Sequence, residues 1–135
     1  MREFKFRGYS TKDNEWRYGF YVTDNITHEI LTKLENNEMY ASQIDFISLG
    51  KYTGFKIKNI EIYENDIIRA RKDYLYKVVF ENGSFVLYHL NKYDGQELIR
   101  WGLLSRLFDS DMKDILEESE IIGNIYENQE LLEDK

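Results

Sequence analysis

The stretch that decides the fold is YLYKVVFENGSFVLYHL, at 74–90. In it, two runs rich in aromatic and β-branched residues flank the pair Asn82-Gly83. Such runs favour β-strands, and an Asn-Gly pair adopts the two positive φ values that a type I′ turn requires. The stretch therefore predicts a β-hairpin, which is the basic unit of an antiparallel sheet.

A second hairpin is predicted near the N-terminus. In EFKFR, at 3–7, aromatic and charged residues alternate, which is typical of a half-buried strand. The polar run STKDNE, at 10–15, forms a turn, and WRYGFYV, at 16–22, resumes the alternation. The strand period predicts one shared face for Trp16, Tyr18, Phe20 and Val22.

Residues 26–41 fit two structures. The spacing of Ile26, Ile30, Leu31 and Leu34 matches one face of a helix. The same residues also read as two strands, ITHEIL and EMYA, around the Asn-rich turn LENN. The helix would be short and poorly capped, so two strands are the preferred interpretation.

The C-terminal part carries the helical signals. DMKDILEE, preceded by Asp109 or Ser110 as N-cap, predicts a short helix near 111–118. EIIGNIYENQELL, at 120–132, predicts a short buried strand with Gly123 at a bulge, then a helical turn near 128–133 capped by Asn128. In this segment we expect burial of Ile121, Ile122, Ile125 and Tyr126, and an apolar patch covered by Leu131 and Leu132.

Composition narrows the class of protein. The chain has 135 residues, 42% of them hydrophobic, and neither cysteine nor proline. Without cysteine there are no disulfides, thiolate metal sites or Cys nucleophile. No apolar run approaches the roughly 20 residues of a membrane span, and no signal peptide is evident. We expect a cytoplasmic protein without membrane contact, and a single domain over 1–135 because no linker or repeat appears.

Charge is unevenly placed along the chain. The net charge is −7, but residues 109–135 hold ten acidic residues and only two lysines, which leaves the first 108 residues close to neutral. The segment 51–77 is locally basic and interleaved with aromatic residues. Small β-barrels bind single-stranded nucleic acid with such surfaces.

Two motifs carry a family resemblance. KYTGFKIKNIEIYENDII, at 51–68, and EIIGNIYENQELLE, at 120–133, are similar to two segments of the YopX-like family, of the types YTGLKDKNGKEIYEGDIV and EVIGNIYENPELL. The opening KFRGYSTKDNEWRYG, at 5–19, also resembles that family's first hairpin. The chain departs from the pattern in a turn one residue shorter at 59–61, in Asn65 for a glycine, and in Gln129 for a proline.

The resemblance implies a phage or prophage protein with a small barrel-like β sheet and no established activity. With the local signals, the predicted fold class is α+β: mainly antiparallel β with hairpins, plus short C-terminal helices. The leading functional hypothesis is a non-catalytic accessory protein that acts in the host cytoplasm by protein binding or assembly. Its partner would be a host or phage protein, or further copies of itself in a homo-oligomer.

The alternative hypothesis is nucleic-acid binding through the 51–77 surface. Its residues are Lys56, Lys58, Arg69, Arg71 and Lys72. A third idea is that the acidic tail imitates nucleic acid. No catalytic, cofactor or metal residues are predicted, since the two histidines, His28 and His89, are far apart in sequence. There is also no nucleophile motif or phosphate-binding loop, and the acids from Asp109 to Glu118 suit a capped, solvated helix.

Overall fold

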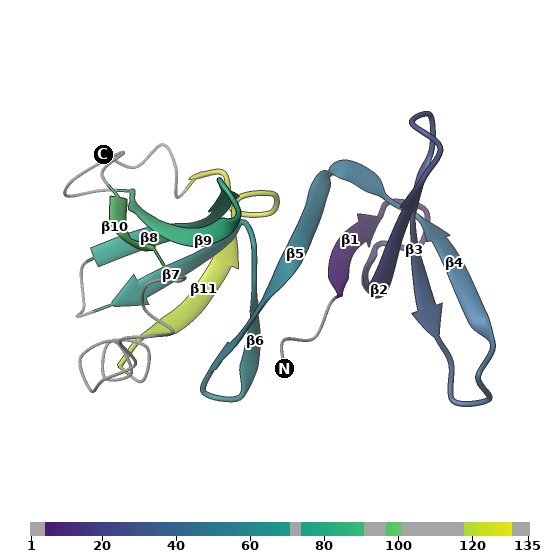
Figure 1. Ribbon diagram of the computed structural model, residues 1–135, viewed down its shortest axis with the longest axis horizontal. Coiled ribbons are helices and arrows are strands. Elements are labelled where there is room, and N and C mark those ends of the chain that lie inside the picture. The colour runs from purple at the N-terminus through teal and green to yellow at the C-terminus, as the bar shows by residue number, and fades with distance from the viewer. Residues whose placement is uncertain (1–4, 71–73, 91–96, 101–117, 131–135) are drawn as a thin grey trace. The chain divides into compact units, whose positions relative to one another are not determined.

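The computed structural model describes residues 5–70, 74–90, 97–100 and 118–130. The chain divides into two compact units, Met1–Gly54 and Phe55–Lys135, whose strands are labelled in Figure 1. The units are described separately, and a single domain over 1–135 stays a prediction.

The first unit is built on strands in the order β4-β3-β2-β1-β5. Their bounds are β1 Phe6–Ser10, β2 Glu15–Thr23, β3 His28–Lys33, β4 Met39–Gln43 and β5 Asp45–Ile57. The N-terminal hairpin is confirmed, because β1 and β2 pair antiparallel with Phe6 opposite Gly19. The two-strand interpretation of 26–41 is confirmed by the antiparallel pairing of β3 with β4.

The buried face of this sheet is not the one that carries the aromatic alternation of β2. Ile30 is fully buried and lies opposite Tyr21 in the register of β2 with β3. Successive side chains of a strand point to opposite faces, so Phe20 and Val22 project away from the buried face. The shared face predicted for this strand therefore exists, but most of it is exposed to solvent.

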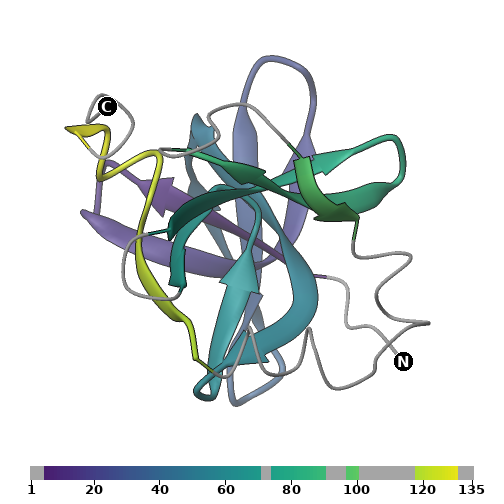
Figure 2. The ribbon, with the colours of Figure 1, turned by 90° about the vertical axis from the view of Figure 1, so that its left-hand side faces the viewer.

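The second unit joins the end of β5 and β6 to a five-stranded sheet in the order β10-β9-β8-β7-β11. The bounds are β6 Ile60–Tyr63, β7 Asp66–Ala70, β8 Tyr74–Glu81, β9 Ser84–His89, β10 Glu97–Arg100 and β11 Glu120–Asn124. Figure 2 turns this unit toward the viewer. Its core is a cluster of buried side chains from β5 to β9: Ile57, Ile62, Ile68, Tyr76, Val78, Phe85 and Leu87.

Two tight turns set the hairpins of the second unit. Asn82 and Gly83 have φ values of 50° and 81°, with Glu81 opposite Ser84 at the end of the ladder. The predicted hairpin and its turn of two positive φ values are thus confirmed. Lys58 and Asn59, between β5 and β6, have φ values of 50° and 68° and form a second turn of this kind.

The terminal motif is a strand laid into the sheet. β11 pairs antiparallel with β7, and the register shifts between Ile121 and Gly123, which confirms the predicted strand and bulge. A Cβ at Gly123 would lie 2.3 Å from Asn128 Oδ1. That oxygen accepts a hydrogen bond from the Asn124 N–H at 3.1 Å. Gly123 therefore makes room for a side chain that closes the turn after the strand.

The apolar residues of this motif are half-buried rather than fully buried. Ile121, Ile122, Ile125 and Tyr126 are all of intermediate exposure, and Ile121 packs against the core cluster. Leu131 and Leu132 lie outside the described residues.

The predicted α+β class is wrong: the fold is β, and no helix is found among the described residues. In the helical turn expected near 128–133, the Asn128 N–H donates to the Asn124 carbonyl at 2.9 Å. Asn128 closes the turn after β11, and residues 131–133 of the expected helical turn lie outside the described residues. Of the helix expected near 111–118, only Glu118 is described, and it lies in a turn.

In the part of the chain that the structure describes, no helix is both long and apolar enough to cross a membrane.

Candidate protein-interaction surface

Exposed apolar side chains gather on the outer face of β2, β3 and β4. Directly opposite residues of antiparallel strands share a face, so the registers place Phe20, Leu31 and Ala41 in one row across the three strands. Neighbours on the same face extend this row along the strands. The whole set, which we call the apolar face, is Tyr18, Phe20, Val22, Leu31, Met39 and Ala41.

The apolar face is unusually open to water. Phe20 is 56% exposed, Val22 45% and Met39 46%. Burying a large apolar side chain stabilises a protein by roughly 1.5–3 kcal/mol, and in this unit these side chains do not contribute that energy. Contiguous exposed apolar patches mark interaction sites in soluble proteins.

The exposure is concentrated in one unit. Among the described residues, ten large hydrophobic side chains are exposed, and nine of them lie within Met1–Gly54. The tenth is Ile60, in the other unit. The second unit buries most of its large apolar side chains in its own core, so the two units differ in how exposed their apolar side chains are.

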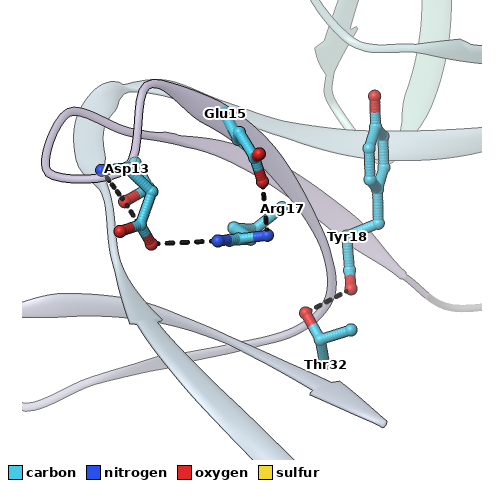
Figure 3. A network of polar contacts seen from close by, with 6 residues as sticks. Asp13, Glu15, Arg17, Tyr18 and Thr32 are labelled. Atoms are coloured by element: carbon cyan, nitrogen blue, oxygen red, sulfur yellow. Dashed lines mark hydrogen bonds and ion pairs between the residues drawn. The ribbon is translucent and has the colours of Figure 1, made fainter. Parts of the chain in front are cut away.

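Polar contacts hold the strands that carry the apolar face (Figure 3). The Arg17 guanidinium lies 2.9 Å from an Asp13 carboxylate oxygen and 2.8 Å from one of Glu15. The hydrogen bond from Arg17 lowers the pKa of Asp13 below its ordinary value. Thr32 Oγ1 donates to the Tyr18 carbonyl oxygen at 2.9 Å and so ties β3 to β2. These contacts orient β2 without covering its outer face.

The opposite face of the sheet holds a row of stacked rings. Tyr21 and His28 stack with ring centroids 5.9 Å apart, and the Tyr21 hydroxyl lies 2.6 Å from His28 Nδ1. The His28 ring also stacks on Phe46 at 4.3 Å, and Phe6 packs against Tyr21 at 5.8 Å. His28 is therefore a packing residue of the first unit.

The basic residues predicted from the sequence are only partly brought together. Lys58 and Arg69 line the same pocket, of about 460 Å³, with Glu118 and Glu120. Arg69 and Glu120 form an ion pair across β7 and β11. Lys56 is exposed on the last residues of β5, whereas Arg71 and Lys72 lie outside the described residues. Acidic groups thus neutralise much of the positive charge in this pocket.

The aromatic residues of the 51–77 segment do not form an open stacking surface. Tyr52, Tyr63 and Tyr76 are buried, with exposed fractions of 4%, 2% and 7%. Phe55 and Tyr74 are partly buried against the core cluster. Base stacking needs an accessible ring face, and these rings pack into the protein instead.

Two buried titratable residues of the second unit, His89 and Asp66, contact neighbouring residues of the fold. His89 is buried in the second unit beside the ring of Tyr76, at 4.8 Å, and burial lowers its pKa. Asp66, only 2% exposed, accepts a hydrogen bond from the Tyr63 N–H at 2.7 Å. Among the described residues, no group of three or more histidine and acidic side chains is placed to hold a metal ion.

Sequence reasoning missed the apolar face. The signal was present as the alternation of Trp16, Tyr18, Phe20 and Val22, but alternation gives the period of a strand and not the direction of its apolar side. In the structure, Tyr21 lies on the opposite face of β2, the face that it shares with the buried Ile30.

The fold and the surface define a class: a β protein of two units, one with a closed apolar core and one that exposes an apolar sheet face. The YopX protein family matches residues 5–133, nearly the whole chain. The chain therefore belongs to the YopX family, as the two sequence motifs implied. A search of curated proteins finds no match.

Proposed function

We propose that this chain is a non-catalytic accessory protein of a phage or prophage, and that it acts by binding another protein through the apolar face. Family membership supports the phage context. The concentration of exposed apolar side chains in the first unit supports the binding mode. The partner would be a protein of the host cell or of the phage, met in the host cytoplasm.

The single observation that carries the proposal is the row of Phe20, Leu31 and Ala41 with its neighbours, in which Phe20 and Ala41 are exposed and Leu31 is half-buried. Protein interfaces are enriched in aromatic residues and methionine at their centre, and this face offers Tyr18, Phe20 and Met39. Glu29 and Lys33 lie on the same face, on either side of Leu31 along β3, where Glu29 is opposite Val22 and Lys33 is opposite Met39.

The test is affinity capture from lysate with the full chain as bait, after nuclease treatment. We expect a protein partner that resists nuclease, is lost from Phe20→Ser and is kept by Ile60→Ser. Ile60 is the matched control because it is exposed to the same degree, 57% against 56%, but lies in the other unit. Equal recovery by both variants, or recovery that needs nucleic acid, would contradict the proposal.

Nucleic-acid binding remains the second candidate, because one pocket brings Lys58 and Arg69 together, although Glu118 and Glu120 line it as well. Binding of this kind should weaken steeply with salt, because neutralised phosphates release counterions. It should also weaken in Lys58→Gln and Arg69→Gln. Titration of single- and double-stranded oligonucleotides at about 50 mM salt tests it, and no binding under this favourable condition excludes it.

A further inference from the structure

The outer edge of the first sheet offers a set of backbone groups in a regular pattern. β4 ends the sheet order, and it pairs with β3 without any register shift. The Ile44 N–H donates to the His28 carbonyl at 2.9 Å, and the Leu34 N–H donates to the Glu38 carbonyl at 2.7 Å. Both ends of the ladder are therefore hydrogen-bonded pairs of even-numbered residues.

This pattern determines which backbone groups point outward. Hydrogen-bonded and non-hydrogen-bonded pairs alternate along an antiparallel ladder, so the pairs formed by odd-numbered residues are not hydrogen-bonded. The backbone N–H and C=O of Met39, Ala41 and Gln43 accordingly point away from β3. In the part of the chain that the structure describes, no strand of the sheet lies beyond them.

This edge lacks the usual protection against pairing. Natural edge strands carry charged residues, proline or a bulge that block the approach of another strand. The sequence of β4 is MYASQ, with no charge and no proline, and its pairing shows no bulge. An edge of this kind is a template for a further strand.

We propose that this edge pairs with the same edge of a second copy, antiparallel and with Ala41 on the two-fold axis. The inference goes beyond the proposed function, because it concerns the backbone edge of β4 and a second copy of this chain, whereas the proposed function concerns the apolar face and another protein. Ala41 would face Ala41 of the partner subunit, and Met39 would face Gln43 of the partner subunit. Each of these three facing pairs would be hydrogen-bonded in both directions, since all six residues direct N–H and C=O outward.

The edge is complementary to itself, which is why a second copy fits better than another protein. A two-fold interface sets one patch against an identical patch, and here the residue on the axis is small and uncharged. The row of Phe20, Leu31 and Ala41 would continue into its own copy as one apolar stripe across the paired sheets.

The charges of the outer face also fit this arrangement. Lys33 lies beside Met39 and Glu29 lies beside Gln43. If Met39 pairs with the partner's Gln43, the row through this pair runs from Lys33 of one subunit to the glutamate beside that glutamine in the other. The symmetry-related row has the same composition. No like charges would face each other across the axis, and like charges directly opposite in a sheet are destabilising.

Charge substitutions at the axis test the pairing directly. Sedimentation equilibrium of the wild type should show a dimer. Ala41→Lys alone and Ala41→Glu alone should each be monomeric, because like charges would meet at the axis. An equimolar mixture of the two variants should recover the dimer. Ala41→Thr is the matched control that keeps the backbone groups and carries no charge, and it should dimerise like the wild type.

Circular dichroism should show that each monomeric variant keeps the strand content of the wild type, which the exposed position of Ala41 on the edge strand favours. A monomeric wild type at the highest concentration, or a mixture no more associated than its components, would overturn the inference. In that case, partner capture that is lost from Phe20→Ser but kept by Ile60→Ser leaves the proposed function standing. Capture unaffected by Phe20→Ser removes the proposed function as well.

Discussion

Asparagine is the main non-glycine residue with positive φ in the described part of this chain, which has no proline. Among the described residues, seven non-glycine residues have positive φ, and six of them are asparagines: Asn14, Asn25, Asn37, Asn59, Asn65 and Asn82. Asparagine tolerates the left-handed region better than other residues with a Cβ. Asn65, which stands where the family pattern has glycine, has a φ of 77°, so the substitution keeps the turn.

Gly83 is a single residue whose backbone conformation can be tested by substitution. No atom lies within 4 Å of a Cβ placed on it, but its φ is +81°. Gly83→Val should therefore cost backbone strain alone, about 1–3 kcal/mol of the free energy of unfolding. Urea denaturation measures this, with Gly83→Asn as the control that tolerates the same φ. A midpoint for Gly83→Val equal to that of Gly83→Asn would contradict the strain argument.

Burial lowers the pKa of His89, so the stability of the protein should depend on pH. The unfolded chain binds the proton at a higher pH than the folded one, because burial favours the neutral ring. The stabilising contribution is therefore complete above the unfolded pKa of about 6.5 and is lost as pH falls below it, toward the folded pKa. The free energy of unfolding should decline between pH 7.5 and 5.5 more for the wild type than for His89→Gln. Parallel pH profiles would show that the histidine does not contribute.

At the scale of an element, β11 and the turn after it work as a unit. Asn124 Oδ1 accepts hydrogen bonds from the N–H groups of Tyr126 and Glu127, at 3.0 and 2.8 Å. Asn128 reaches back over Gly123 to the Asn124 N–H. The two asparagines satisfy the backbone groups that the end of the strand leaves open.

A double-mutant cycle tests this unit. Gly123→Ala should push the Asn128 side chain from its place, which loses a hydrogen bond worth about 0.5–1.5 kcal/mol and strains the turn. In the background of Asn128→Ala the same glycine substitution should cost less, because the clashing oxygen is gone. Unfolding free energies of the four proteins give the coupling. Additive effects would mean that the close approach is not responsible.

At the scale of the whole molecule, the two units differ in the exposure of their large apolar side chains. Phe85 is 1% exposed in the core cluster of the second unit, while Phe20 is 56% exposed in the first. Phe85→Ala should lower the free energy of unfolding by about 3–5 kcal/mol. Phe20→Ala should change it by less than about 0.5 kcal/mol. Thermal melting of both variants separates the roles, and a large loss from Phe20→Ala would mean that its face is covered.

Much of the fold could be predicted because its determinants are local. Asn82-Gly83 predicted its hairpin, since the φ preferences of these two residues act within the turn itself. Two strands were preferred for 26–41 because a helix there would be short and poorly capped. Gly123 was expected at a bulge from its place inside a strand pattern. The candidate surface was not predicted, because the direction of a strand face depends on which residues the neighbouring strands bury.

The hairpins, their turns and the family could be predicted from the sequence, because strand periods, turn φ values and the two motifs are properties of short segments, whereas the predicted α+β class with C-terminal helices was wrong. The tertiary structure decided three things that no short segment contains. It placed Tyr21 on the buried face of the sheet and Phe20 on the exposed face, because Tyr21 pairs with the buried Ile30 of β3. It paired Arg69 with Glu120 from a distant segment. It also placed the Asn128 side chain over Gly123, where its oxygen accepts a hydrogen bond from the Asn124 N–H at the end of β11.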